Sequence, residues 1–108
     1  MKPGGQHEYL EALYEMAEEG IPTVQARLAE WAGVSAASVS EAVKRLTERG
    51  LVTTGPDRRV AFTADGEAAA RALVRRHRLA ERFLVDIVGL PWHLAHQEAT
   101  EWGPVISD

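Results

Sequence analysis

Three side chains in the second half of the chain have the types and spacing to share a metal ion. His77 and Glu81 are four residues apart, so a helix would project both from one face, and His96 could close the site from a following antiparallel helix. Imidazole and carboxylate ligands suit iron(II), manganese, cobalt, nickel or zinc, and the lack of cysteine excludes thiolate ligands. The alternative is a core histidine satisfied by hydrogen bonds, which is the commoner role for such a residue.

Two carboxylates near the N-terminus form a second candidate metal site. Glu8 and Glu11 are three residues apart and would lie on one side of a helix. Further glutamates follow at positions 15, 18 and 19, a pattern that is also typical of a solvated helix face. Both interpretations stay open.

The basic side chains gather in the middle of a chain whose net charge is −4. Residues 24–59 carry six basic and four acidic side chains, whereas the first 20 residues carry one lysine and five glutamates. This middle third is the surface that could face phosphates.

The spacing of apolar residues predicts the elements that position these groups. A helix over residues 7–19 ends at Gly20, and a short helix capped by Thr23, with Val24, Leu28 and Trp31 as its apolar residues, ends at Gly33. Ser35 caps the next helix, which runs to Gly50. The two short helices and the turn between them predict a helix-turn-helix.

The segment that follows these helices favours a winged helix over an unrelated helical bundle. Two β-prone runs, residues 51–54 and 60–62, flank a Gly-Pro-Asp turn. A long helix capped by Thr63 then runs to Gly89, and a further helix begins at Pro91. We therefore expect a mostly α fold, with a winged helix-turn-helix over residues 1–65 and dimerisation helices over residues 66–108. Their apolar faces need a cover, and a homodimer interface is the expected one.

A winged helix places the second helix of the pair in the major groove with its N-terminal residues toward the bases. The residues expected there are Ser35, Ala37, Ser38, Ser40 and Glu41, and the cations around them are Arg27, Lys44, Arg45, Arg58 and Arg59. Glu41 could accept a hydrogen bond from cytosine or could repel phosphate. A solvated charged face is the alternative for each cation.

Composition limits the remaining possibilities. The chain has 108 residues, with 45% hydrophobic and 26% charged side chains, as in globular proteins. It has no apolar run long enough to span a membrane and no secretory signal, so a cytoplasmic location is expected. Neither a catalytic nucleophile nor a glycine-rich phosphate loop accompanies the histidines, which argues against an enzyme and a small-molecule substrate.

Three stretches carry a resemblance to a known family: HEYLEALYEMAEEG, SAASVSEAVKRLTERGLV and RRHRLAERFLVDIVGLPW. They resemble the iron-dependent, diphtheria-toxin-repressor type of metalloregulator and its manganese-sensing relatives. The resemblance covers nearly all of the chain. It implies a homodimeric winged-helix repressor of metal-homeostasis genes, which binds palindromic operators when a divalent metal activates it. The expected metal is Fe²⁺ or Mn²⁺, with Zn²⁺, Co²⁺ or Ni²⁺ as alternatives.

The resemblance also implies residue roles. It assigns the ancillary metal site to His77, Glu81 and His96, and the regulatory metal site to Glu8 and, in the manganese-sensing branch, Glu11. It assigns operator contacts to Ser35, Ala37, Ser38 and Glu41, and places Gln25 and Arg27 near the phosphate-contacting positions.

The chain departs from the family at three regulatory-site positions. Thr100, Gly103 and Pro104 stand where the family has a cysteine or glutamate, a glutamate and a histidine, so this regulatory site is expected to be degenerate. Family members also continue beyond the position of Asp108, which leaves a fragment, an altered form or a shortened relative as alternatives. A metal-dependent regulator is therefore expected, with a metal-independent dimerising module that modulates a full-length relative as the alternative.

Overall fold

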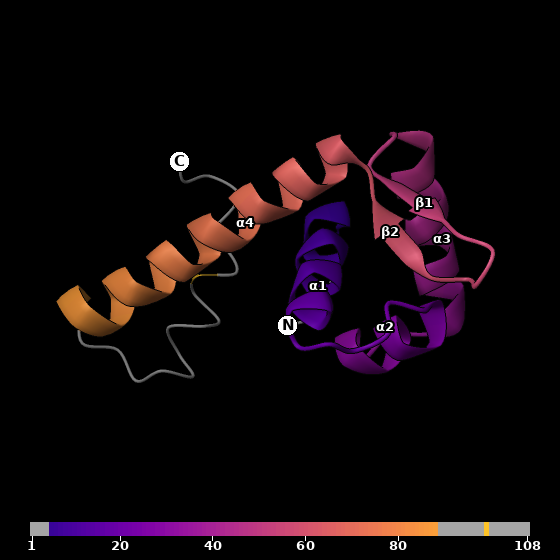
Figure 1. Ribbon diagram of the computed structural model, residues 1–108. Helices are drawn as coiled ribbons and strands as arrows, with labels where there is room; N and C mark the ends of the chain where they lie inside the picture. Colours follow the sequence, from indigo (N-terminus) through magenta and orange to yellow (C-terminus); the bar gives the residue numbers. More distant parts are fainter. Residues whose placement is uncertain (1–4, 89–98, 100–108) are drawn as a thin grey trace. The chain divides into compact units, whose positions relative to one another are not determined.

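The computed structural model describes residues 5–88 and Ala99 (Figure 1). Its elements, in chain order, are α1 (Gln6–Glu18), α2 (Gln25–Ala32), α3 (Ala36–Glu48), β1 (Val52–Thr54), β2 (Val60–Phe62), α4 (Ala64–Phe83) and a π-helical turn (Leu84–Val88). Three helices followed by a two-stranded hairpin form a winged helix, as the sequence predicts. No helix in this part of the chain is long and apolar enough to cross a membrane.

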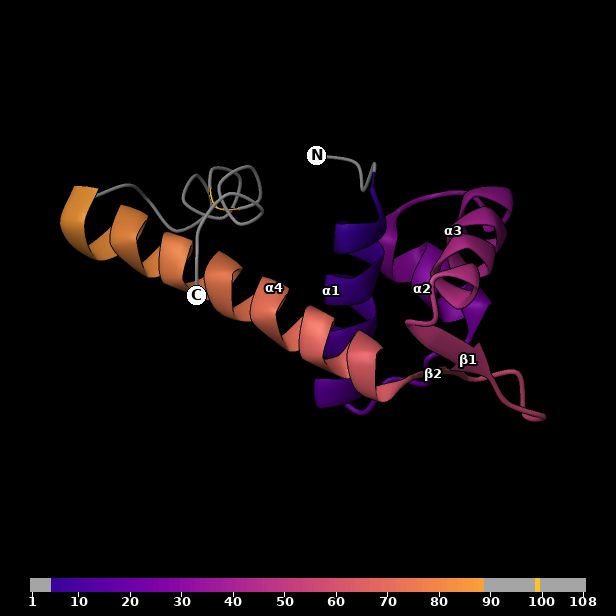
Figure 2. The same cartoon turned by 90° about the horizontal axis from the view of Figure 1, so that it is seen from above.

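The chain divides into two compact units within α4, between Ala70 and Arg71. In the first unit, α1, α2 and α3 pack together and the hairpin lies beside α3 (Figures 1 and 2). The core of this unit comes from every element, and its largest fully buried side chains are Leu13, Met16, Leu28, Val39, Leu46 and Val52. Full burial of one such side chain contributes roughly 1.5–3 kcal/mol, so this core fixes the position of α3.

The N-cap of α2 differs from the one expected from the sequence, whereas the N-cap of α3 is the expected one. The N-cap of α2 is Val24, without a side-chain cap, because the Thr23 hydroxyl instead donates to the Val60 carbonyl at 2.9 Å. Trp31, one of the three apolar residues expected of this helix, is 39% exposed. At α3 the Ser35 hydroxyl accepts the Ser38 N–H at 3.1 Å, which is the expected cap. Gly33 joins the two helices in the left-handed conformation.

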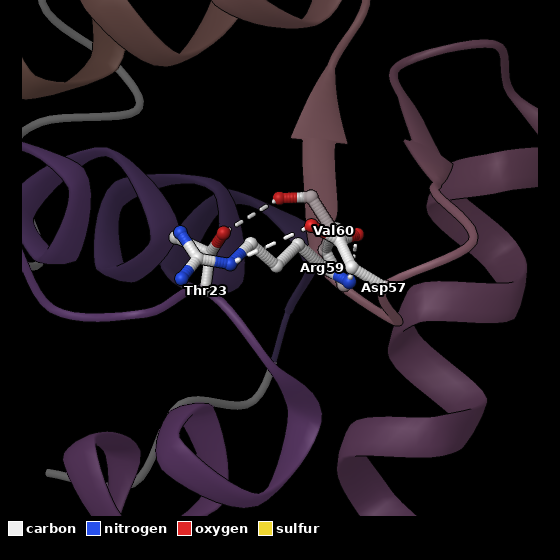
Figure 3. A network of polar contacts seen from close by, with 4 residues as sticks. All are labelled: Thr23, Asp57, Arg59 and Val60. Atoms are coloured by element: carbon white, nitrogen blue, oxygen red, sulfur yellow. Dashed lines mark hydrogen bonds and ion pairs between the residues drawn. The ribbon is translucent and has the colours of Figure 1, made fainter.

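The hairpin that forms the wing, residues 52–62, is tied to the segment before α2. Antiparallel pairing sets Val52 opposite Phe62 and Thr54 opposite Val60. The Val60 N–H donates to the Thr23 carbonyl at 2.9 Å, and Val24 forms a bridge with Arg59. Figure 3 shows Thr23 beside Val60 at this junction. The backbone before the helix-turn-helix therefore restrains the wing.

Thr63 and Gly66 fix the start of α4 against the chain segment that leaves α3. The Thr63 hydroxyl donates to the Gly50 carbonyl at 2.6 Å and accepts the Gly66 N–H at 3.0 Å. Thr63 is thus the predicted cap of the long helix. A Cβ at Gly66 would lie 1.7 Å from the Leu51 carbonyl oxygen, so only glycine fits there.

The second unit has a small apolar core of its own. Ala80 and Leu84 are buried together with Ala99, and Val85 packs against them. Leu79 and Phe83, four residues apart on α4, are 48% and 45% exposed. Apart from Ala99, the helix expected after Pro91 lies outside the described residues.

Candidate nucleic-acid interface and metal ligands

The first turns of α3 present small polar and apolar side chains to solvent. Ser35, Ala37, Ser38, Ser40 and Glu41 are all exposed, as a base-reading surface requires. The Ser35 hydroxyl donates to the Ser38 hydroxyl at 3.0 Å while it accepts the Ser38 N–H. Ser35 is thereby committed to capping the helix, whereas Ser38 keeps its own hydroxyl proton for donation.

Glu41 and Arg45 form an ion pair one turn further along α3. The Arg45 Nε donates to the Glu41 Oε1 at 3.1 Å, and both side chains are more than half exposed. The carboxylate cancels the guanidinium charge at close range while the pair holds. Exposed pairs of this kind contribute roughly 0–1 kcal/mol, so a phosphate can compete for the arginine.

A groove of about 690 Å³ separates the start of α1 from this face of α3. Its lining includes Ser38, Glu41, Arg45 and Arg49 from α3 and its C-cap, and Gln6 and His7 from α1. The Arg49 guanidinium donates to the Gln6 side-chain oxygen across it. Sequence reasoning gave no role to Gln6 or His7, and it included Arg49 only among the six basic side chains of residues 24–59. The four-residue spacing from Arg45 is the signal that could have found Arg49.

The other predicted cations lie on α2, on α3 and in the wing. Arg27 and Lys44 are exposed, and Gln25 is half-buried at the first turn of α2. Arg58 and Arg59 are exposed in the turn of the wing. The backbone of Arg58 has a φ of 65°, a left-handed value that residues other than glycine rarely adopt.

Asp57 holds Arg59 in the turn of the wing (Figure 3). Its carboxylate accepts the Arg59 N–H at 3.1 Å and lies 3.7 Å from the Arg59 Nε. The predicted phosphate-facing residues thus all lie in the compact unit that holds the winged helix, and Asp57 is an acidic neighbour of Arg59 there.

His77 and Glu81 are the two predicted metal ligands that the structure brings together. The Nε2 of His77 lies 2.7 Å from Oε1 of Glu81, and each residue is 8% exposed. A nearly buried imidazole nitrogen beside a carboxylate oxygen is a donor pair that fits a divalent transition metal. A shared ion would replace their direct contact.

The remaining predicted ligands lie elsewhere or outside the description. Glu8 and Glu11 are half-buried on α1, in the other compact unit. His96, and the departing positions Thr100, Gly103 and Pro104, fall outside the described residues. Among residues 5–88 and 99, no group of three or more metal-ligating side chains occurs.

Two family models together match most of the chain. The model "Iron dependent repressor, N-terminal DNA binding domain" matches residues 6–60, which comprise α1 to the first residue of β2. The model "Iron dependent repressor, metal binding and dimerisation domain" matches residues 63–108. The chain belongs to the iron-dependent repressor family. The family resemblance drawn from the sequence is therefore confirmed, as is the winged-helix fold.

Curated relatives extend beyond the length of this chain. The diphtheria toxin repressor of Corynebacterium jeikeium (strain K411) is 46% identical over 100 residues, which are 93% of this chain and 42% of that protein. The iron-dependent repressor IdeR of Mycobacterium tuberculosis (strain ATCC 25618 / H37Rv) is 44% identical over 93% of this chain and 44% of its own length. The chain thus spans less than half the length of these relatives.

Solved structures of manganese regulators share the fold. The manganese regulator SloR superposes with a TM-score of 0.86 at 33% identity, over 100% of this chain and 50% of that one. A manganese-dependent transcriptional repressor, solved in complex with manganese, gives a TM-score of 0.83 at 40% identity over 96% of this chain and 48% of that one.

Proposed function

We propose that this chain binds double-stranded operator DNA as a homodimer and acts as a metal-dependent transcriptional repressor of metal-homeostasis genes. The observation that carries the proposal is the exposed first half of α3, with its small side chains and flanking cations, in a chain of the iron-dependent repressor family. Residues 1–65 contribute the DNA-binding domain and residues 66–108 the dimerisation and metal-binding segment. The protein acts in the cytoplasm and is not an enzyme.

In this proposal α3 enters the major groove. Ala37 and Ser38 face base edges, where a methyl group contacts thymine methyls and a hydroxyl bonds to bases or phosphates. Phosphate contacts set the register and supply much of the affinity. The residues that make them are Gln25, Arg27, Ser40, Lys44, Arg45, Arg58 and Arg59, while Ser35 caps the first turn of α3.

His77 and Glu81 hold the divalent metal in this proposal, with His96 as the third ligand and Fe²⁺ or Mn²⁺ as the ion. An ion held by these three residues would link α4 to the segment that carries His96 and would stabilise the second unit. The exposed apolar side chains of Leu79 and Phe83 support a dimer interface along α4. Glu8 and Glu11 provide the remnant of a regulatory site.

A metal-independent function is the second candidate. Thr100, Gly103 and Pro104 favour it, because none of these side chains is a strong metal ligand at a position where the family has one. In that case the chain dimerises, or pairs with a full-length relative, and modulates its activity without sensing metal.

A DNA-binding titration separates these candidates. A palindromic duplex selected from a random-sequence library serves as the probe, and fluorescence anisotropy is followed with chelator, with Mn²⁺ and, without oxygen, with Fe²⁺. The proposal expects salt-sensitive binding that either metal tightens. Equal binding with chelator and with metal indicates a constitutive regulator. If the selection yields no duplex with chelator or with either metal, that result contradicts DNA binding by this chain.

A further inference from the structure

The groove between α1 and α3 has a specific arrangement of charge. Arg45 and Arg49 follow one another by four residues along α3 and its C-cap, so both side chains project from the face that lines the groove. Gln6 contributes its side-chain amide from the opposite wall. We infer that this groove receives a backbone phosphate of DNA through Arg49, with Gln6 as the residue that positions the guanidinium. The inference rests on the proposed DNA-binding function.

The two arginines differ in what holds them. Arg45 donates to a carboxylate, which cancels its charge at close range. Arg49 donates to the amide oxygen of Gln6, which carries no net charge. The Gln6 contact therefore orients Arg49 and leaves its positive charge available to attract an anion. An arginine also keeps further N–H donors after one is used, and their fork matches two phosphate oxygens.

The length of α3 places Arg49 near a phosphate rather than a base. From Ser38 to Arg49 the helix rises about 16 Å at 1.5 Å per residue, which exceeds the roughly 12 Å width of the major groove. With the first turn of α3 among base edges, its C-terminal end reaches the flank of the groove, where the phosphates lie. Gln6 accepts a hydrogen bond from Arg49 at this end of α3.

The role predicts a sequence-independent contribution. A phosphate contact weakens binding to all duplexes alike when it is lost, whereas a base contact changes preference among them. Loss of one phosphate contact also lowers the slope of log affinity against log salt by about 0.9. These two signatures distinguish Arg49 from a structural residue whose loss would lower thermal stability alone.

Three variants of the full 108-residue chain test this inference. Arg49→Gln should reduce affinity for the selected palindrome and for an unrelated duplex equally, by about five- to tenfold, and lower the salt slope by about 0.9. Arg49→Lys keeps the charge, so the salt slope should stay while affinity falls less. Gln6→Ala should reduce affinity about two- to threefold with the slope unchanged, because it removes orientation and not charge.

Arg82→Gln is the matched control, since it removes one positive charge from an exposed arginine of α4 that pairs with Asp86. If Arg49→Gln and Arg82→Gln give the same affinity and slope as wild type, the inference is overturned while DNA binding stands. If Arg49→Gln alters preference between the two duplexes, Arg49 reads bases and the phosphate role is wrong. If wild type shows no salt-sensitive DNA binding, the proposed function itself fails.

Discussion

Glu41 lies one helical turn before Arg45 on α3, and its Oε1 accepts a hydrogen bond from the Arg45 Nε at 3.1 Å. The pair stands on the face that we propose for DNA. A phosphate that approaches Arg45 must therefore displace the carboxylate, and the displaced carboxylate stays close enough to repel it. We therefore expect Glu41 to lower the affinity of α3 for DNA.

Glu41→Gln is accordingly expected to increase affinity for duplex DNA by about three- to tenfold at low salt, with a steeper salt dependence. Anisotropy titrations over a range of salt concentrations measure both quantities. Glu48→Gln, which removes an exposed glutamate from the same helix, is the control. An equal gain in DNA affinity in the two variants would mean that the change in net charge accounts for the effect and that Glu41 has no specific role.

Substitution of Arg58, in the turn of the wing, by glycine should raise the stability of the fold and lower its affinity for DNA. Its φ of 65° is a left-handed conformation that costs a non-glycine residue roughly 1–2 kcal/mol. Arg58→Gly should therefore raise the free energy of unfolding in urea by about 1 kcal/mol while it weakens DNA binding. Arg58→Ala removes the charge without relieving the strain, so it should weaken binding with no gain in stability. A gain in stability from both variants would contradict the strain argument.

Gly66 should tolerate no side chain. A Cβ there would lie 1.7 Å from the Leu51 carbonyl oxygen, which is a backbone atom and cannot rotate away. Gly66→Ala is expected to lower stability by about 3 kcal/mol and the melting temperature by at least 10 °C. Gly5→Ala meets nothing within 4 Å and serves as the control. Similar melting temperatures for the two variants would mean that α4 does not pack on Leu51 in solution.

His77 should control the response of stability to metal. At a free Mn²⁺ concentration 100-fold above the dissociation constant, wild type should gain about 2.7 kcal/mol, and His77→Ala should lose most of that gain. Calorimetric titration with Mn²⁺ measures the affinity, and thermal unfolding with and without Mn²⁺ measures the gain in stability. Because each variant is compared with itself in the absence of metal, a loss of stability from the cavity at His77 does not affect the result. Asp86→Asn, an exposed carboxylate outside the His77 and Glu81 pair, is the control. An unchanged metal affinity in His77→Ala would refute its role as a ligand.

Local signals in the sequence were sufficient for most of the winged helix. Ser35 and Thr63 cap their helices as predicted, because a hydroxyl bonds to N–H groups only three residues away. The buried face of α3, with Val39 and Leu46, follows from helical periodicity. Thr23 was the exception. It looks like a cap by sequence, but its hydroxyl donates to Val60, which is 37 residues away.

The candidate sites divide in the same way. The exposed first turns of α3 and the contact of His77 with Glu81 are set by spacing within one helix, so the sequence alone placed them. The contact between Arg49 and Gln6 joins residues 43 apart and exists only because α1 packs beside α3. No periodicity encodes that approach, since it depends on how two helices cross over a shared core. The sequence by itself determined the family, the helices, the contact of His77 with Glu81 and the local pairs of Arg45 with Glu41 and Arg59 with Asp57. Tertiary packing decided that Arg49 is held by an uncharged amide from another helix.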